Sequence, residues 1–188
     1  ALLRPALEDG QLIIHGTEQE PLKIQKATSG EQLSVQIWDD TCDAILYPEE
    51  VNRWFSRELG QSARLVYMPE SSRRAVDPRF AQQEEVVSFA DGYPFLVISE
   101  ESLSDLNSRL DQPVPMNRFR PNLVVKGGEA FDEDRLKSFV LNGIQFLAVK
   151  PCARCQVITI DQTTTEMSKE PLKTLATYRR SGKKVLFG

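Results

Sequence analysis

The 188-residue sequence has a single histidine, His15, and only three cysteines. One imidazole excludes catalytic zinc sites built on several histidines and argues against a serine–histidine triad, so we expect a structural or surface role for His15. Three cysteines are too few for a disulfide scaffold, and we therefore expect a reducing, cytoplasmic compartment. The chain also lacks a signal-peptide pattern and any apolar run of about 18 residues, which excludes a membrane-spanning helix.

Positive charge is also in short supply. The chain has 23 lysines and arginines against 27 acidic residues, a net charge of -4, which argues against binding to a nucleic-acid backbone. Its 40% hydrophobic and 27% charged residues are typical of a soluble globular protein. The sequence begins with Ala1 rather than methionine, so we expect a fragment or a processed form.

Short strands separated by turns dominate the first third of the chain. Alternating or β-branched runs predict strands over residues 11–15, 21–25, 33–38 and 63–68. Between the last two, Pro48 and Gly60 bracket a predicted helix with an apolar stripe at Val51, Trp54, Phe55 and Leu59. We expect that stripe to be core rather than a ligand platform.

Residues 69–85 are polar and contain two prolines, which indicates an exposed connection or domain linker. The pair Arg73 and Arg74 could contact an anion, but the pattern favours a solvated loop. The resulting domain prediction is 1–70 and 71–188.

The second half mixes predicted strands (95–99, 123–126, 156–160) with short helices (100–110 and one opened by Pro171). Asn142-Gly143 between alternating apolar residues predicts a hairpin within 139–149. Many strands and few helices indicate an α+β, β-rich fold of barrel-like or sandwich character.

The stretch KPCARCQVITID, residues 150–161, places two cysteines three apart with Lys150 and Arg154 nearby. Thiolates bind soft metals, and their reactivity depends on neighbouring charge. A structural zinc site would need Cys42 and His15, both distant in sequence. A thioredoxin-like pair would need a helix after it, whereas QVITI predicts a strand. Burial as two small hydrophobic residues is the third alternative.

Two further segments could bind an anion. In MNRFRPNLVV, residues 116–125, extended backbone would point Arg118 and Arg120 to one face, suited to a phosphate or carboxylate. The alternative is a surface pair bound to the acidic residues 132–134. In FADGYPF, residues 89–95, exposed amides could meet an anion, although a plain turn is the commoner explanation.

FADGYPFLVISEESLSDLN, NRFRPNLVV, EAFDEDRLK, VKPCARCQVITID and KEPLKTLATYR, in this order, resemble the MOSC-domain family over residues 89–180. WDD-T-CDA and WFSRELG resemble, more weakly, the β-barrel domain that precedes MOSC. The resemblance implies a partial N-terminal β-barrel-like domain followed by a MOSC β-barrel domain. It also implies that this chain is truncated at both ends, before a cofactor-binding segment at one and a closing strand at the other.

In that family a molybdenum cofactor is held between the two domains, and one protein cysteine ligates the metal. The resemblance places this ligand, the expected catalytic group, at Cys155. It places the cofactor-binding positions at Arg120, Asn122, Cys152, Ala153, Arg154, Gly92, Tyr93 and Pro94.

Three functions remain open. The first is a molybdenum-cofactor oxidoreductase that reduces small N-hydroxylated compounds, such as amidoximes, with electrons from a donor protein or a separate iron–sulfur domain. The second is a cofactor or sulfur carrier in which Cys155 holds a persulfide. The third is a noncatalytic binding module with structural cysteines. No membrane or nucleic-acid partner is expected.

Overall fold

A computed structural model describes residues 3–27, 29–81 and 84–188. The chain divides into two compact units, Ala1–Pro94 and Phe95–Gly188. A compact unit is not the same thing as a family domain, so the predicted domain division at residues 70 and 71 stays a prediction. No helix in the described ranges is long and apolar enough to cross a membrane.

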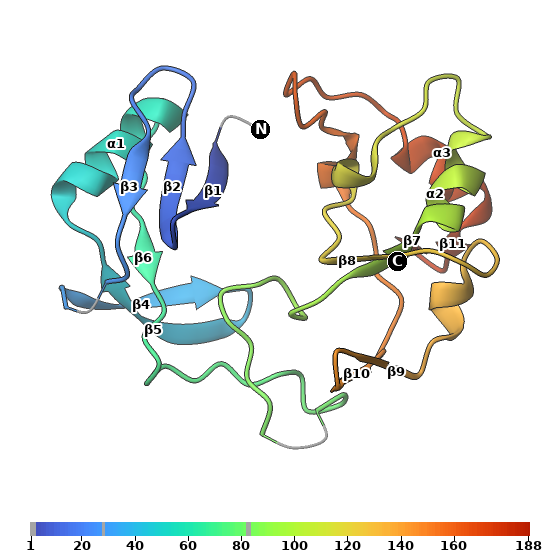
Figure 1. The fold of residues 1–188 in the computed structure, drawn as a ribbon, viewed down its shortest axis with the longest axis horizontal. Helices are drawn as coiled ribbons and strands as arrows, with labels where there is room; N and C mark the ends of the chain where they lie inside the picture. Colours follow the sequence, from blue (N-terminus) through green and yellow to red (C-terminus); the bar gives the residue numbers. More distant parts are fainter. Residues whose placement is uncertain (1–2, 28, 82–83) are drawn as a thin grey trace. The chain divides into compact units, whose positions relative to one another are not determined.

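The first unit holds two three-stranded antiparallel sheets and one helix (Figure 1). The first sheet contains β1 (Arg4–Glu8), β2 (Gln11–His15) and β3 (Leu22–Ile24), and the second contains β4 (Gln32–Ile37), β5 (Asp40–Leu46) and β6 (Val66–Tyr67). The helix α1 (Glu49–Leu59) lies beside the first sheet. Its buried Val51 and Phe55 pack against Ile14 and Ile24, as the apolar stripe predicted. Gly60 ends it in the left-handed conformation, at φ 61°.

Residues 69–81 and 84–90 are tied into the first unit by Arg74, which is only 5% exposed. Its Nε donates to Asp40 Oδ2 at 2.7 Å, and its Nη1 donates to the carbonyls of Ser88 at 3.0 Å and Ala90 at 2.6 Å. The expectation of a solvated loop is therefore wrong for Arg74, although Arg73 is exposed. Because a buried guanidinium needs several acceptors, Arg74 fixes the course of the backbone around it.

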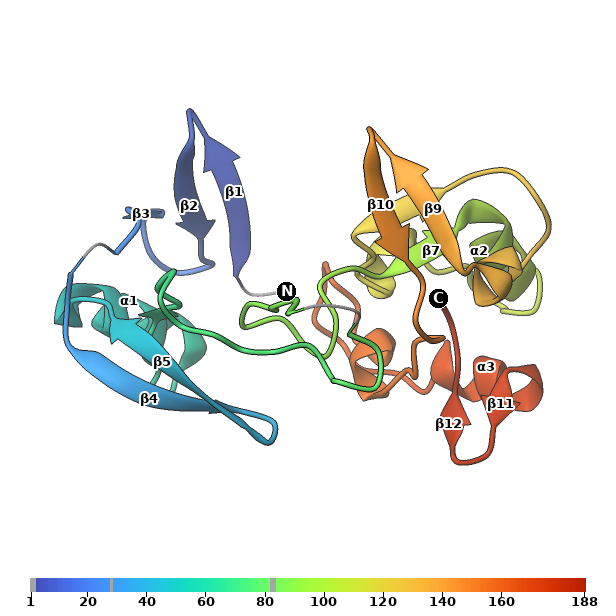
Figure 2. The same ribbon diagram turned by 90° about the horizontal axis from the view of Figure 1, so that it is seen from below.

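The second unit has three short sheets and two α-helices. Its helical segments are α2 (Glu100–Asn107), α3 (Leu172–Tyr178) and the 3-10 turns η1 (Met116–Arg118), η2 (Asp132–Arg135) and η3 (Gln156–Thr159). Its strand pairs are the parallel β7 (Val97–Ser99) and β8 (Leu123–Val125), and the antiparallel β9 (Ser138–Leu141) with β10 (Ile144–Leu147) and β11 (Arg180–Ser181) with β12 (Lys184–Val185). Figures 1 and 2 both show the hairpin β9–β10 standing apart from α3.

The second unit has its own hydrophobic core, centred on side chains that are almost fully buried: Ile98, Leu106, Phe119, Ile158, Leu175 and Phe187. Phe119 and Phe187 stack in a tilted geometry with ring centroids 4.4 Å apart. Phe119 follows η1, and Ile158 lies in η3. The core therefore anchors the two segments that contain Arg118 and the paired cysteines.

The α+β, β-rich fold class is confirmed. The sheets of the described residues number five, each has two or three strands, and none closes into a barrel. The predicted strand at residues 156–160 is wrong, because this segment forms η3. Ile158 and Thr159 are both buried while Val157 is 42% exposed, so the buried face does not alternate as a strand requires.

Candidate functional site

The segment with the paired cysteines, residues 150–155, is held by the end of the chain. The N–H of Arg154 donates to the carbonyl of Val185 at 2.7 Å, and the N–H of Phe187 donates to the carbonyl of Cys152 at 3.0 Å. Ala153 forms an isolated antiparallel bridge with Leu186. These backbone contacts fix a loop, not a strand, in front of η3.

The two thiols of this loop have different surroundings. Cys155 precedes the first residue of η3 and is exposed, whereas Cys152 is half-buried. Arg154 Nη1 lies 3.2 Å from Cys152 Sγ, within hydrogen-bond distance. Burial of both cysteines as small hydrophobic residues is therefore ruled out, and the buried cysteine is Cys42, at 3% exposure. Cys155 offers the accessible thiol.

Arg154 joins this loop to the turn that contains Arg120. Its Nη2 donates to the carbonyl of Phe119 at 2.7 Å, and its guanidinium carbon lies 5.8 Å from the centre of the Phe119 ring. Its Nε is buried without a hydrogen-bond partner in the described residues. A buried unpaired donor is costly, and such atoms are a common feature of sites that accept a ligand.

The expectation that Arg118 and Arg120 share one face of an extended segment is wrong. Arg118 belongs to η1 and is buried, and its Nη2 donates to Asp161 Oδ2 at 2.6 Å. Arg120 is exposed and has a left-handed backbone, with φ 55°. A 3-10 turn followed by a left-handed residue does not alternate as a strand does, so the two guanidinium groups separate. The alternative pairing of these arginines with residues 132–134 is also wrong for Arg118.

Asn122 stabilises the start of β7 and β8. The side-chain oxygen of Asn122 accepts the backbone N–H of Leu96 at 2.9 Å, while the backbone N–H of Asn122 donates to the Leu96 carbonyl at 2.9 Å. Its predicted place near a cofactor stays a prediction. The same holds for Gly92, Tyr93 and Pro94, which precede β7 and belong to the first unit.

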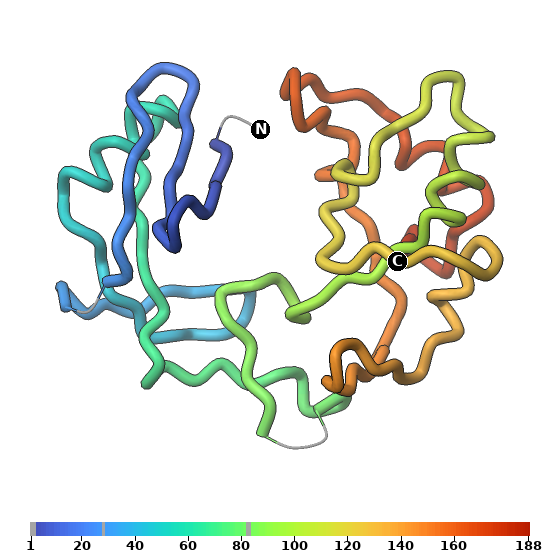
Figure 3. Tube along the Cα trace, viewed as in Figure 1, coloured from blue at the N-terminus to red at the C-terminus, as the bar shows by residue number. Residues whose placement is uncertain are grey.

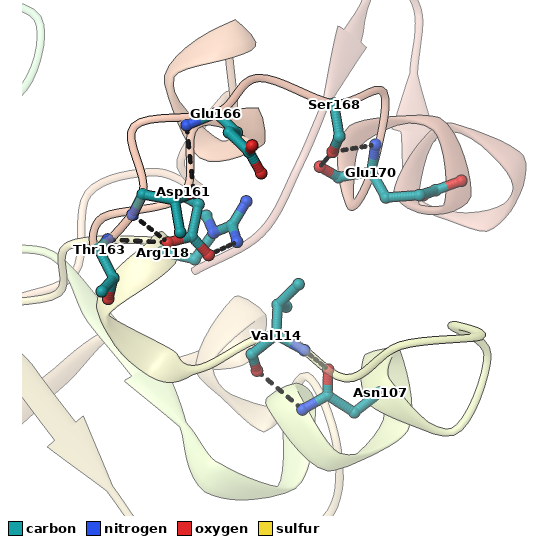
Figure 4. Close-up of polar contacts among 9 residues, drawn as sticks. Asn107, Val114, Arg118, Asp161, Thr163, Glu166, Ser168 and Glu170 are labelled. Carbon is teal, nitrogen blue, oxygen red and sulfur yellow. Dashed lines mark hydrogen bonds and ion pairs between the residues drawn. The ribbon is translucent and has the colours of Figure 1, made fainter.

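Sequence reasoning assigned no function to Asp161, yet its carboxylate accepts several hydrogen bonds (Figure 4). Its Oδ1 accepts the N–H groups of Thr163 at 2.8 Å and Thr164 at 3.0 Å, and its Oδ2 accepts Arg118. The bonds from Thr164 and Thr163, followed by the charge of Arg118, lower the pKa of Asp161. An aspartate in a polar turn is the available signal, because its side chain often accepts the backbone N–H two residues on in an Asx turn.

The segments 116–120 and 152–161 lie side by side, although more than thirty residues separate them in sequence (Figure 3). Together they offer one exposed thiol, one partly buried thiol and three arginines, of which Arg118 is paired with Asp161. No cluster of three or more His, Cys, Asp or Glu side chains suited to a metal occurs in the part of the chain that the structure describes. This donor set fits a metal that brings most of its own ligands better than a bare ion held by the protein alone.

Comparison with known proteins finds one family model and several relatives that match this chain. Residues 84–188 match the model of the MOSC domain. Molybdenum cofactor sulfurase from Oryza sativa subsp. japonica is 36% identical over 202 residues, which cover 97% of this chain and 24% of the relative. Human mitochondrial amidoxime-reducing component 1 is 35% identical over 153 residues, covering 74% and 45%. Mitochondrial amidoxime reducing component 2 from Rattus norvegicus is 33% identical over 187 residues, covering 95% and 55%.

The chain thus spans between 24% and 55% of the length of these three relatives. The family match covers the second unit in full, with Cys152, Cys155 and both arginine segments inside it. The chain belongs to the MOSC domain family.

Proposed function

We propose that the chain binds a molybdenum cofactor through Cys155 and belongs to an oxidoreductase that reduces small N-hydroxylated compounds. The observation that carries this proposal is the exposed Cys155 thiol next to Arg154, whose Nε is buried without a partner among the described residues. A thiolate is a suitable soft donor for molybdenum, and a free N–H donor suits an anionic or carbonyl acceptor on a cofactor. The names of the amidoxime-reducing relatives support this choice of substrate class.

In this proposal the chain's own residues would bind and orient the cofactor. Cys155 would ligate the metal, Arg154 and Arg120 would face the negative charge of the cofactor, and Cys152 would keep Arg154 in place through its sulfur. When bound, the molybdenum cofactor supplies the electron chemistry that removes oxygen from a hydroxylated nitrogen. Conversion of an N–OH group to N–H consumes two electrons and two protons and releases water. A separate electron donor, a protein or an iron–sulfur domain, is therefore part of the proposal.

A second candidate is a cofactor or sulfur carrier. It is favoured by the match to a molybdenum cofactor sulfurase that covers 97% of this chain. In this role Cys155 would carry a persulfide or hold the intact cofactor for delivery.

Expression of the chain with molybdate, followed by elemental analysis, tests both candidates. The oxidoreductase proposal expects stoichiometric molybdenum and reduction of an amidoxime by a supplied electron donor, with loss of both in Cys155→Ser. The matched control Cys152→Ser removes the sulfur that contacts Arg154, so we expect retained metal and an activity loss of about tenfold. Stoichiometric metal without reductase activity would favour the carrier. Metal-free protein, or equal loss in both variants, would contradict the assignment of Cys155.

A further inference from the structure

Two arginines join the segments 116–120 and 152–161 in opposite directions. Arg118 of the first segment donates to the carboxylate of Asp161 in the second, at 2.6 Å. Arg154 of the second segment donates to the carbonyl of Phe119 in the first, at 2.7 Å. The two bonds form a reciprocal pair, which we call the arginine clamp, and Cys155 lies in the chain between its two ends.

The Arg118–Asp161 bond joins a buried guanidinium to a partly exposed carboxylate. The Arg118 side chain is 9% exposed and that of Asp161 is 33% exposed. Arg118 Nε has no hydrogen-bond partner in the described ranges. Because a buried guanidinium is stable only when its charge is satisfied, loss of the Asp161 carboxylate would leave Arg118 strongly disfavoured in its place.

Asp161 is itself held rigidly. Its other oxygen accepts two backbone N–H groups (Figure 4), and its own backbone N–H donates to the carbonyl of Glu166 at 2.9 Å. The carboxylate therefore joins the turn at residues 161–166 to η1. Each of the two segments also contributes one side chain to the core, Phe119 at 0% and Ile158 at 1% exposure. The segment that includes Cys155 is thus fixed at Arg154, at Ile158 and at Asp161.

We infer that Arg118 and Asp161 are positioning residues for the cysteine loop, acting through the arginine clamp although neither contacts a cysteine in any described bond. The Arg118–Asp161 bond sets the position of η1 against η3. The position of η1 in turn presents the Phe119 carbonyl to Arg154, and Arg154 fixes Cys152. The consequence for catalysis rests on the proposed function of Cys155, but the mechanical coupling does not.

The test measures the alkylation rate of each cysteine by iodoacetamide in metal-free, folded protein. Trypsin cleaves after Arg154, so Cys152 and Cys155 fall in separate peptides that mass spectrometry can quantify independently. We expect Asp161→Asn and Arg118→Lys each to raise the Cys152 rate at least about fivefold, the effect of losing one charged hydrogen bond. Asparagine can still accept the Thr163 and Thr164 N–H groups, and lysine keeps the charge of Arg118, so both variants target the clamp itself.

Glu100→Gln is the matched control. It removes the carboxylate of an exposed ion pair in the same unit, 3.2 Å from Lys126 Nζ, and should leave the Cys152 rate unchanged. The double variant Arg118→Lys/Asp161→Asn should raise the rate no further than either single variant, because both changes break one bond.

An unchanged Cys152 rate in a folded Asp161→Asn or Arg118→Lys protein would overturn the inference and leave Asp161 with a purely local role in its turn. If one variant fails to fold, the other decides. The measurement needs no molybdenum. A wild-type protein that binds no molybdenum would therefore contradict the proposed function but not the arginine clamp. An unchanged alkylation rate in the variants would contradict the clamp but not the proposed function.

Discussion

At the scale of single residues, a carboxylate of α1 closes the loop after β2. Glu58 is buried and accepts the backbone N–H of Thr17 at 2.9 Å and of Glu18 at 3.3 Å. A side chain at Gly16 would collide with this carboxylate, so the glycine is required for the close approach. The hydrogen bond from Thr17, helped by that from Glu18, lowers the pKa of Glu58.

We therefore expect Glu58→Gln to lower the melting temperature at pH 7 by roughly a few degrees. Because the pKa of Glu58 is lower in the folded protein, its stabilising effect is complete above the ordinary glutamate pKa, about 4.3. The effect disappears as the pH falls through the lowered pKa. Thermal unfolding at pH 7 and about pH 3 checks this, since the difference in melting temperature between wild type and variant should be smaller in acid. A difference of the same size at both pH values would contradict it.

Side-chain roles of this kind were the part of the protein hardest to predict. Composition and spacing drew attention to Arg74 and Arg118, but not to their partners, because those partners lie far away in sequence. Asp40 is 34 residues from Arg74, and Asp161 is 43 residues from Arg118. Which arginine becomes buried depends on tertiary packing, and local pattern carries no information about that.

At the scale of elements, turn chemistry was the most reliable guide. Asn142 and Gly143 both have positive φ, 50° and 79°, as a tight hairpin turn requires, and β9 pairs with β10 around them. The helix between Pro48 and Gly60 was predicted for a similar reason, since both residues restrict the backbone locally. The strand predicted at 156–160 failed because burial of adjacent Ile158 and Thr159 stabilises a 3-10 turn that β-branched composition does not reveal.

Gly143→Ala tests the turn. No atom lies within 4 Å of the place a new Cβ would occupy, so the cost is purely that of the left-handed backbone, about 1–2 kcal/mol. The control Asn142→Gly keeps the turn accessible and should change the free energy of unfolding by less than about 0.5 kcal/mol. Urea unfolding followed by circular dichroism measures both. Equal losses would show that the hairpin does not depend on its backbone conformation.

At the scale of the whole molecule, the described residues form two hydrophobic cores, one in each unit. One centres on Ile14, Ile24 and Phe55, and the other on Phe119, Leu175 and Phe187. Each unit therefore has a hydrophobic core of its own, which is one requirement of an independent folding unit. The candidate site residues from Arg118 to Asp161 all lie in the second unit.

The two tryptophans, Trp38 and Trp54, both lie in the first unit, so tryptophan fluorescence reports its unfolding alone. Leu175 is fully buried in the second core, and Leu175→Ala should destabilise that unit by about 2–5 kcal/mol. We expect the urea midpoint from circular dichroism to fall while the fluorescence midpoint stays in place. The mirror variant Ile24→Ala should shift the fluorescence midpoint. If Leu175→Ala shifts both signals together, the two units unfold as one. A destabilising change at the cysteine loop would then also lower the stability of the first unit.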